Sequence, residues 1–385
     1  MSYLTNFCFE LPTKIEYGVG VIQKLSDTLS DLKAEKILII SDKGIGQCGL
    51  LDAIRDQLAA AGLDHKTFDK VEANPKDYNV QQGAQIAADF KAEGLVAVGG
   101  GSPIDCAKAI AVVATHGGSA RDYEGRGMIT KETIPLIAIP TTAGSGSEVT
   151  FSAVITDSRE KFKFSIKATK NAPRVALVDP EMTMTMPPGL TAATGMDALT
   201  HAIEAFTSRA ATPFSNATAL YAVELITQHL KTAVFDGHNL EARAGMLMGS
   251  VLAAIAFSHS DVASVHCIAE ALGGKYDTPH GVCNAVVLPA MMEYNMSYCR
   301  EQYARIAAAM GLRYKSIDEG SEKAIEAVNN LVVEVNLPNF KSFDVKEKDF
   351  EELAQNSVNN GSNIDNPRPM TKKDYLNVLG KLNSL

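Results

Sequence analysis

Four side chains of types that bind divalent metals stand in two helical stretches of the second half of the chain. In GMDALTHAIEAF, Asp197 and His201 are four residues apart, so a helix would place them on one face, about 5–6 Å apart at Cβ. In SVHCIAEALGGKYDTPHG, His266 lies in a helical pattern and His280 follows a turn-rich segment. One carboxylate and three imidazoles suit Fe²⁺ or Zn²⁺ and leave room for a substrate oxygen. We therefore predict one metal site built from both stretches; a surface Asp–His pair, a core histidine and a loop histidine are the alternatives.

A metal at this place would have a definite chemical use. It would polarise a carbonyl group, or stabilise the alkoxide that must form before a hydride leaves an alcohol carbon. The neighbours of Asp197 and His201 are apolar, which indicates a buried helix, and a buried aspartate needs a strong partner.

A glycine-rich turn in the first half is a candidate nucleotide site. In VGGGSPIDCAKAIA, three glycines at 99–101 follow a predicted strand. We expect Ser102 to be the N-cap of the next helix, with Pro103 at its first position and Asp105 completing a capping box. Glycines allow backbone N–H groups to approach a ligand, and a helix N-terminus attracts anions. The turn is thus a candidate diphosphate site, with a plain strand–helix turn as the alternative.

Two further strand ends carry polar side chains. Asp42 ends the strand KILIISD, where a carboxylate can bind the ribose diol of NAD and repel the 2′-phosphate of NADP; a solvated turn residue is the alternative. In TTAGSGSE, residues 141–148, small hydroxyl side chains follow another strand and can line a nicotinamide and its ribose. Because ligands bind at the carboxyl ends of parallel strands, three such ends in one sheet favour a nucleotide site.

The elements that must position these residues fall into two classes. Strand patterns at 36–42, 95–101 and 136–140 alternate with helical patterns such as 50–62, which predicts a parallel sheet with helices on both faces. From about Pro187 the apolar residues recur at helical spacing and strand patterns nearly vanish. We expect an α/β domain over 1–186 and an all-helical domain over 187–385. Thr371, with Asp374 three residues later, predicts the start of a last helix.

Composition narrows the class of partner. A formal net charge of −9 in 385 residues argues against nucleic acid and anionic membranes as main partners. The chain has no run of about 18 apolar residues, and its start, MSYLTNFCFELP, lacks a signal pattern. Six cysteines without CxxC pairing fit reduced thiols better than a disulfide framework. We expect a cytoplasmic protein that acts on a small molecule.

The segments ATGMDALTHAIEAF and GGKYDTPHGVCNAVVLP resemble the two signatures of the iron-containing (group III) alcohol dehydrogenases. FELPTKIEYGVG, GGGSPIDCAKA, IPTTAGSGSEVT and LVDPEMT also match, in the order of the family. The resemblance covers essentially the whole chain. It implies a Rossmann-like N-terminal domain, a helical C-terminal domain in the dehydroquinate-synthase-like architecture, NAD(P), Fe²⁺ or Zn²⁺, and a homo-oligomer of two or more copies.

The family's functional residues carry over by position. The implied metal ligands are Asp197, His201, His266 and His280. The implied cofactor residues are Gly99, Gly100, Gly101 and Ser102 at the diphosphate, Thr141, Thr142 and Ser147 at the ribose and nicotinamide, and Lys163 at the adenosine ribose. Asp42 falls where the family distinguishes the two cofactors at the 2′ position, so the resemblance favours NAD.

One departure from the family concerns proton transfer. Many members have a second histidine four residues after the position of His266, where this chain has Glu270. If one helix runs through this region, His259, His266 and Glu270 share a face. Glu270 would then relay the proton, aided by His259. The alternative is that Glu270 tunes substrate choice, while water and the cofactor ribose carry the proton.

The sequence thus predicts a metal-dependent, NAD-preferring dehydrogenase that interconverts a small primary alcohol or diol with its aldehyde. The first alternative is a dehydroquinate-synthase-like lyase, which would need several Arg and Lys residues for its substrate; apolar segments such as GSVLAAIAFS argue against it. The second is a catalytically weak NAD-binding or assembly protein, which the four intact candidate ligands argue against.

Overall fold

The computed structural model describes residues 6–384 and divides into two compact units. One unit is Glu10–Met186 and the other contains Pro187–Leu385. The described residues before Glu10 belong to the second unit, since the ring of Phe9 stacks on Phe214 and on His259. The first five residues of the stretch inspected for a signal pattern lie outside the described residues.

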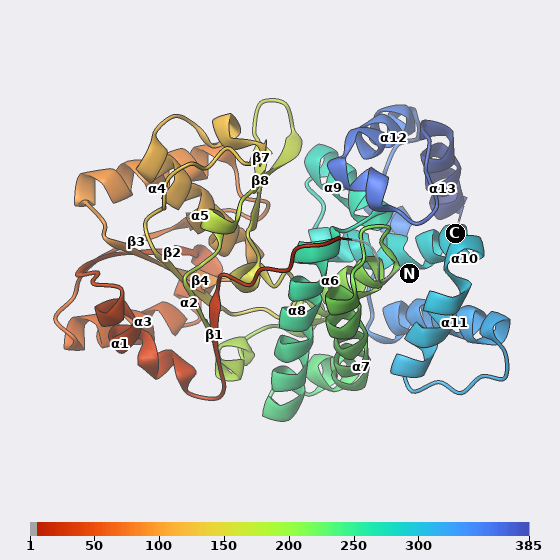
Figure 1. Ribbon diagram of the computed structural model, residues 1–385, viewed down its shortest axis with the longest axis horizontal. Coiled ribbons are helices and arrows are strands. Elements are labelled where there is room, and N and C mark those ends of the chain that lie inside the picture. The colour runs from red at the N-terminus through yellow and green to blue at the C-terminus, as the bar shows by residue number, and fades with distance from the viewer. Residues whose placement is uncertain (1–5, 385) are drawn as a thin grey trace. The chain divides into compact units, whose positions relative to one another are not determined.

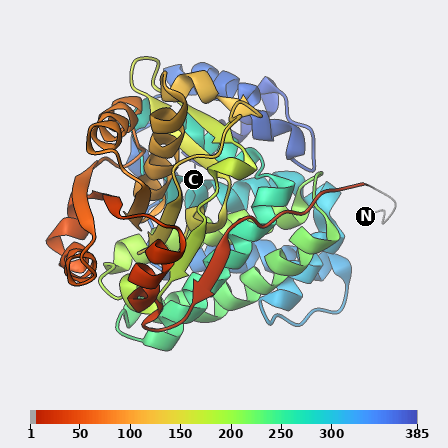
Figure 2. The same cartoon turned by 60° about the vertical axis from the view of Figure 1, so that its left-hand side comes forward.

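The first unit is built on a six-stranded parallel sheet, as the strand–helix alternation predicts. The strand order is β1-β9-β6-β4-β2-β3, with β1 and β3 at the two edges. Figure 1 labels β1 to β4 of this sheet, and Figure 2 shows the same ribbon turned by 60°. All five strand pairs are parallel. The strands are β1 (Lys14–Tyr17), β2 (Lys36–Asp42), β3 (Asp64–Val71), β4 (Gly94–Gly99), β6 (Leu136–Pro140) and β9 (Val175–Val178).

Alternate side chains of each central strand enter two different cores, because successive Cβ atoms of a strand point to opposite faces. On β2, Ile37 and Ile39 pack with residues of α1 (Leu25–Asp31) and α3 (Leu50–Ala60). Leu38 and Ile40 pack with residues of α4 (Asp77–Phe90) and α5 (Gly101–His116). Burial on both faces explains why these strands are almost continuously apolar.

A second, smaller sheet was not foreseen from the sequence. It has the order β5-β8-β7, in which β7 and β8 are antiparallel and β5 pairs parallel to β8. Its strands are β5 (Gly125–Arg126), β7 (Ser152–Asp157) and β8 (Phe162–Lys167). The remaining elements of this unit are short: α2 (Lys43–Gln47), η1 (Val21–Lys24), η2 (Ala120–Tyr123), η3 (Ser147–Val149), η4 (Thr169–Asn171) and η5 (Pro180–Thr183).

The second unit is helical, as expected. Helix α6 packs against α7, α8 and α10, and α9 packs against α10 and α12. The helices are α6 (Pro188–Thr207), α7 (Pro213–Phe235), α8 (Leu240–Ser260), α9 (Ser264–Tyr276), α10 (His280–Ala309), α11 (Ile317–Glu334), α12 (Phe350–Asn359) and α13 (Lys372–Ser384), with short turns η6 (Phe340–Phe343), η7 (Glu347–Asp349) and η8 (Gly361–Asp365).

The predicted start of the last helix is confirmed. The backbone N–H of Thr371 donates to Asp374 Oδ2 at 2.9 Å, and the N–H of Asp374 donates to Thr371 Oγ1 at 3.4 Å. This reciprocal capping box satisfies N–H groups that have no partner inside the helix.

Helix α8 is long and apolar enough to cross a membrane by length and composition, the one such helix in the part of the chain that the structure describes. Its most apolar window has a mean hydropathy of 1.4 and is 61% buried within the protein. It packs against α6 and α7. A helix that is apolar on all sides suits this buried position in a bundle.

Candidate metal centre and cofactor surface

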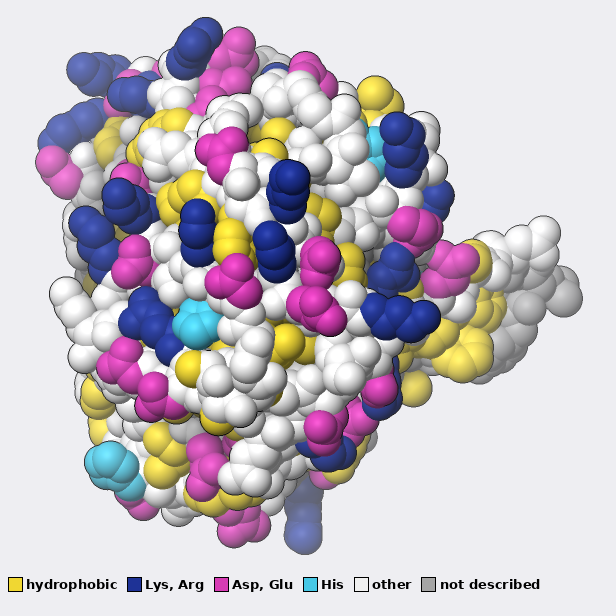
Figure 3. Space-filling view, turned by 90° about the vertical axis from the view of Figure 1, so that its left-hand side faces the viewer, with side chains coloured by type: hydrophobic (Ala, Val, Ile, Leu, Met, Phe, Trp, Pro, Cys, Tyr) yellow, Lys and Arg dark blue, Asp and Glu magenta, His cyan; other side chains and the backbone are white. Residues whose placement is uncertain are grey.

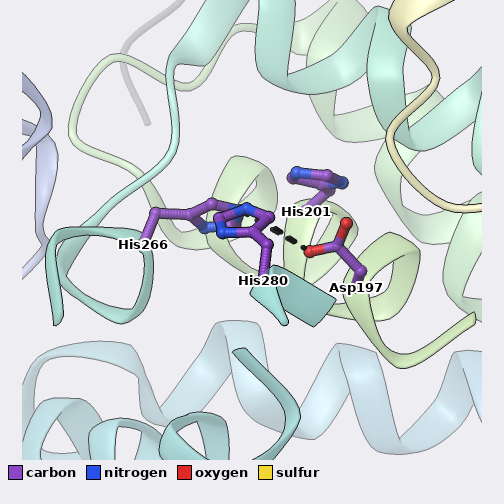
Figure 4. A group of neighbouring side chains, drawn as sticks. All are labelled: Asp197, His201, His266 and His280. Atoms are coloured by element: carbon purple, nitrogen blue, oxygen red, sulfur yellow. Dashed lines mark ion pairs between the residues drawn. The ribbon is translucent and has the colours of Figure 1, made fainter. Parts of the chain in front are cut away.

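The helical unit brings together the four residues predicted to bind a metal. Asp197 and His201 come from α6, His266 from α9, and His280 is the first residue of α10. One ligand atom from each lies within 4.8 Å of the others, and the four side chains converge in Figure 4. Asp197, His201 and His266 are buried, whereas the side chain of His280 is 31% exposed. The cluster is therefore shielded on most sides and accessible beside His280.

The geometry of the cluster suits a cation. Asp197 Oδ1 lies 4.0 Å from His266 Nε2 and 3.8 Å from His280 Nε2. The rings of His201 and His266 stack at 4.7 Å between centroids. Burial raises the pKa of Asp197, but the three imidazoles together outweigh it and hold that pKa below its usual value. An ionised carboxylate and three imidazole nitrogens form a donor set that fits Fe²⁺ or Zn²⁺.

Asn284 belongs to this cluster and escaped the sequence analysis. It is fully buried on α10, one helical turn after His280. Its Nδ2 donates to Asp197 Oδ1 at 2.6 Å and lies 3.1 Å from His266 Nε2 and 3.2 Å from His280 Nε2. The i, i+4 spacing from a candidate ligand could have identified it. Its amide holds three of the four ligand atoms close together.

Glu204 is a second residue that the sequence analysis missed. It is buried on α6, three residues after His201. Its carboxylate lies 2.5 Å from His266 Nδ1 and accepts hydrogen bonds from the N–H groups of Ala263 and Val265. Burial lowers the pKa of His266, but Glu204, with help from Asp197, more than offsets this, so that pKa is raised. A second acidic residue within a largely apolar helix, seven residues after Asp197, was the available signal.

Gly281 allows α10 to reach the cluster. A Cβ atom at this position would lie 2.5 Å from the carbonyl oxygen of Ala193 on α6 and 3.3 Å from Asp197 Cβ. The obstacle is helix backbone, which cannot turn aside as a side chain can. The glycine after His280 is thus what lets the first turn of α10 lie against the part of α6 that carries Asp197.

Neither of the two residues proposed for proton transfer belongs to the set of converging ligands. Glu270 stands on α9 one turn after His266, and its Oε2 accepts a hydrogen bond from Asn360 Nδ2 at 2.6 Å. His259 Nδ1 lies 2.7 Å from Ile255 O, and its ring stacks on Phe9 at 4.1 Å.

The continuous helix assumed for His259, His266 and Glu270 is wrong. Helix α8 ends at Ser260 and α9 begins at Ser264. Between them Asp261 has φ of +57°, a left-handed conformation that ends a helix. The face shared by His259 and His266 in one straight helix does not exist.

In the α/β unit, the glycine turn packs against the loop that follows β6. Strands β4 and β6 are neighbours, and Thr141 N donates to Gly99 O at 3.0 Å. A Cβ on Gly100 would lie 3.0 Å from Thr142 Oγ1, and one on Gly101 would lie 2.8 Å from Ser145 Oγ. The two predicted cofactor loops therefore meet where the carboxyl ends of β4 and β6 lie side by side. Glycine is needed for their close approach.

The expected cap of α5 is wrong. The helix begins at Gly101, with Gly100 as its N-cap and no side-chain cap, so Ser102 lies inside the first turn. Asp105 instead accepts hydrogen bonds from Val154 N at 3.0 Å and Ser147 Oγ at 2.5 Å. No side chain caps the N-terminus of this 16-residue helix. Such an end, preceded by glycines, fits an anionic diphosphate.

A buried lysine holds the loop that contains Ser147. The side chain of Lys108 is fully buried on α5. Its Nζ donates to Ser147 Oγ at 2.9 Å, Thr150 Oγ1 at 2.9 Å and the carbonyl oxygen of Ser152 at 2.7 Å. Burial lowers the pKa of Lys108, against the opposing charges of Asp105 and Glu148. Lys108 therefore ties α5 to the loop after β6 and fixes the position of Ser147.

Asp42 and Lys163 have structural partners of their own. Asp42 Oδ1 accepts from Ile45 N at 3.0 Å and so caps α2. It is the last residue of β2, which pairs parallel to β4. Asp42 therefore lies at the same end of the strands as the glycine turn that follows β4. Lys163 lies on β8 in the small sheet, and its Nζ donates to Asn74 Oδ1 at 2.7 Å.

Comparisons with known proteins identify similar chains. A family model described as "Iron-containing alcohol dehydrogenase" matches residues 12–180, and one described as "Fe-containing alcohol dehydrogenase family, C-terminal" matches residues 191–382. A 1,3-propanediol dehydrogenase of Citrobacter freundii is 39% identical over 98% of this chain and 99% of its own. An NAD-dependent methanol dehydrogenase of Bacillus methanolicus is 37% identical, covering 98% and 99%. A crystal structure of a 1,3-propanediol oxidoreductase superposes with a TM-score of 0.95, at 38% identity, covering 98% and 100%.

The contact at Gly281 gives a first prediction. Gly281→Ala should destabilise the helical unit by about 1–3 kcal/mol, because its methyl group overlaps helix backbone. It should also weaken Zn²⁺ binding about tenfold or more by shifting His280. Thermal unfolding and Zn²⁺ titration measure both effects. Gly380→Ala, at an exposed position of α13 where nothing lies within 4 Å, is the control and should stabilise by about 0.5–1 kcal/mol. Wild-type Zn²⁺ affinity in Gly281→Ala would contradict the assignment.

Glu148 gives a second prediction. Burial raises the pKa of Glu148 from 4.5 to about 7. The folded α/β unit thus binds a proton that the unfolded chain has released, so stability should fall as the pH rises from about 4.5 to about 7. The loss from this one group is up to about 3 kcal/mol. Glu148→Gln should abolish this part of the pH dependence in denaturant unfolding. If the free energy of unfolding of Glu148→Gln falls with pH between 4.5 and 7 as steeply as that of the wild type, the carboxyl group is not buried in its protonated form.

Proposed function

The chain belongs to the iron-containing alcohol dehydrogenase family, and on that premise we propose that it interconverts a small primary alcohol or diol with its aldehyde, using NAD(H). The observation that carries this proposal is the convergence of Asp197, His201, His266 and His280. The names of the similar proteins support the substrate class, since one acts on a propanediol and another on methanol.

The four converging residues would hold Fe²⁺, or Zn²⁺ in its place. When bound, such a cation supplies positive charge that stabilises an alkoxide oxygen or polarises an aldehyde. Asp197 contributes the one negative charge among the ligands, and Asn284 Nδ2 holds its Oδ1 in place. The partly exposed His280 lies on the side from which a small alcohol would enter.

The cofactor would be bound by the loops at the sheet edge of the α/β unit. The N-terminus of α5 would take the diphosphate at Gly99, Gly100, Gly101 and Ser102. Thr141, Thr142 and Ser147 would contact the nicotinamide side, and Lys163 the adenosine ribose. Asp42 would accept from the ribose diol, which favours NAD over NADP.

Two roles remain for Glu270: proton relay, or a pocket acid that tunes substrate choice. The hydrogen bond from Asn360 supports the second, because it fixes the carboxylate in one orientation. The contacts of His259 with Phe9 and Ile255 support a packing role for that ring rather than a catalytic one.

The setting of the reaction is also part of the proposal. We infer a cytoplasmic homo-oligomer with no nucleic acid or membrane partner. The net charge of −9 supports the absence of nucleic acid and of anionic membranes among its partners, as does the mixture of acidic and basic side chains on the face drawn in Figure 3. A dehydroquinate-synthase-like lyase and a catalytically weak assembly protein are the alternatives, and neither explains the similarity to named dehydrogenases.

The metal ligands give a third prediction. Asp197→Ala and His280→Ala should each lose Zn²⁺ and Fe²⁺ binding, and NADH oxidation with a panel of small aldehydes should fall about a thousandfold or more. The exposed His238 lies between α7 and α8, and His238→Ala is the control that should keep both properties. Full metal occupancy and wild-type turnover in either ligand variant would remove that residue from the site. Wild-type protein inactive with every aldehyde would point to one of the alternatives.

The cofactor preference gives a fourth prediction. Asp42→Gly and Asp42→Ser should both raise kcat/KM with NADPH relative to NADH, because each removes a negative charge from the 2′ position. The serine variant keeps an oxygen that can cap α2, so it separates cofactor choice from local stability. If the ratio of kcat/KM with NADH to kcat/KM with NADPH is the same in both variants as in the wild type, Asp42 acts only as the cap of α2.

A further inference from the structure

The carboxylate of Glu204 joins two of the helices that carry candidate metal ligands. It projects from α6, the helix of Asp197 and His201, and reaches the first turn of α9, the helix of His266. Oε2 accepts from Ala263 N at 2.9 Å and lies 2.5 Å from His266 Nδ1, and Oε1 accepts from Val265 N at 2.7 Å. Both carboxylate oxygens therefore face N–H donors.

We propose that Glu204 is the positioning residue of the metal centre, which fixes the tautomer of His266 and the place of α9 beside α6. Both Glu204 oxygens accept backbone N–H bonds, so the ring nitrogen that faces them must donate. Nδ1 then carries the hydrogen, and Nε2 keeps its lone pair. It is Nε2 of His266 that lies near Asp197 Oδ1 and Asn284 Nδ2. The hydrogen bond made by one ring nitrogen decides which nitrogen is left to bind a metal.

The break between α8 and α9 makes this link necessary. The chain turns at Asp261, where φ is +57°, and the first N–H groups of α9 have no partners inside the helix. Glu204 binds two N–H groups at this turn with the same carboxylate that faces His266. A purely structural role as the cap of α9 is the competing explanation. Capping accounts for the contacts with Ala263 and Val265, but it does not require His266 to adopt either tautomer.

The inference rests on the proposed metal centre, so the experiment separates the two. Zn²⁺ titration of the wild-type protein tests the centre itself. Long-range ¹H–¹⁵N NMR of metal-free protein, labelled with ¹⁵N in histidine and assigned with His266→Ala, tests the tautomer. We expect His266, as the neutral ring, to carry its hydrogen on Nδ1. A neutral ring with its hydrogen on Nε2 in the wild-type protein overturns the proposal, whether or not Zn²⁺ binds.

Glu204→Gln tests the consequence for the metal. The amide can still accept a backbone N–H bond but offers its own N–H to His266, so the ring hydrogen should move to Nε2. Zn²⁺ affinity should then fall about 10–100-fold, and the visible spectrum of the Co²⁺-loaded protein should change. Thr207→Val, a buried change one turn further along α6, is the control and should alter neither.

The variant also distinguishes positioning from capping. Under capping alone, Glu204→Gln lowers the midpoint of thermal unfolding while Zn²⁺ affinity and the Nδ1–H tautomer stay as in the wild type, and that result overturns the proposal. If Glu204→Gln fails to fold, the wild-type NMR result decides by itself.

Discussion

Everything in the helical unit depends on burying negative charge along one face of α6. Asp197 and Glu204 are seven residues apart on a helix whose other neighbours are almost all apolar, and His201 stands between them. A carboxylate that is taken out of water without partners costs far more than any packing contact returns. Each of the two therefore requires donors from other elements. Asp197 meets the amide of Asn284 and the imidazoles, and Glu204 meets the first turn of α9. Satisfying these two groups fixes the positions of α9 and α10, and the cluster of ligand atoms is the result.

In the α/β unit, the constraint is the close approach of the loops that follow β4 and β6. The glycine turn lies close to the loop after β6, because Gly100 and Gly101 lack the side chains that would meet Thr142 and Ser145. Lys108 links the same loop after β6 to helix α5. Its buried ammonium group satisfies the hydroxyls of Ser147 and Thr150 together. The loop after β6 is thus held in place by a buried positive charge.

Features that depend on residues close together in the chain could be predicted from the sequence, and features that depend on contacts between distant segments could not. The strands β2, β4 and β6, the helix α3 and the capping box at Thr371 followed from periodicity and from residues a few positions apart. The spacing of Asp197 and His201 predicted their shared face. The failures depend on contacts between distant segments. Asp105 does not cap α5 because Ser147 and Val154 compete for it across more than 40 residues of chain. Glu204 and Asn284 could not be assigned because their roles exist only when α6, α9 and α10 meet. The break at Asp261 was hidden in a segment with helical composition, where no glycine or proline marks the turn.

The contact between Gly281 and Ala193 has a consequence for anyone who wishes to diversify this enzyme. The two signature segments are separate in the chain, yet one methyl group added to the second would strike the backbone of the first. Libraries that randomise the His280 segment will lose most of their members at this position, whatever substrate is used for selection. Glu270 on α9 and Asn360, the residue after α12, take no part in that contact and bond to each other through their side chains. Libraries built on this pair would leave the backbone contact between Gly281 and Ala193 unchanged.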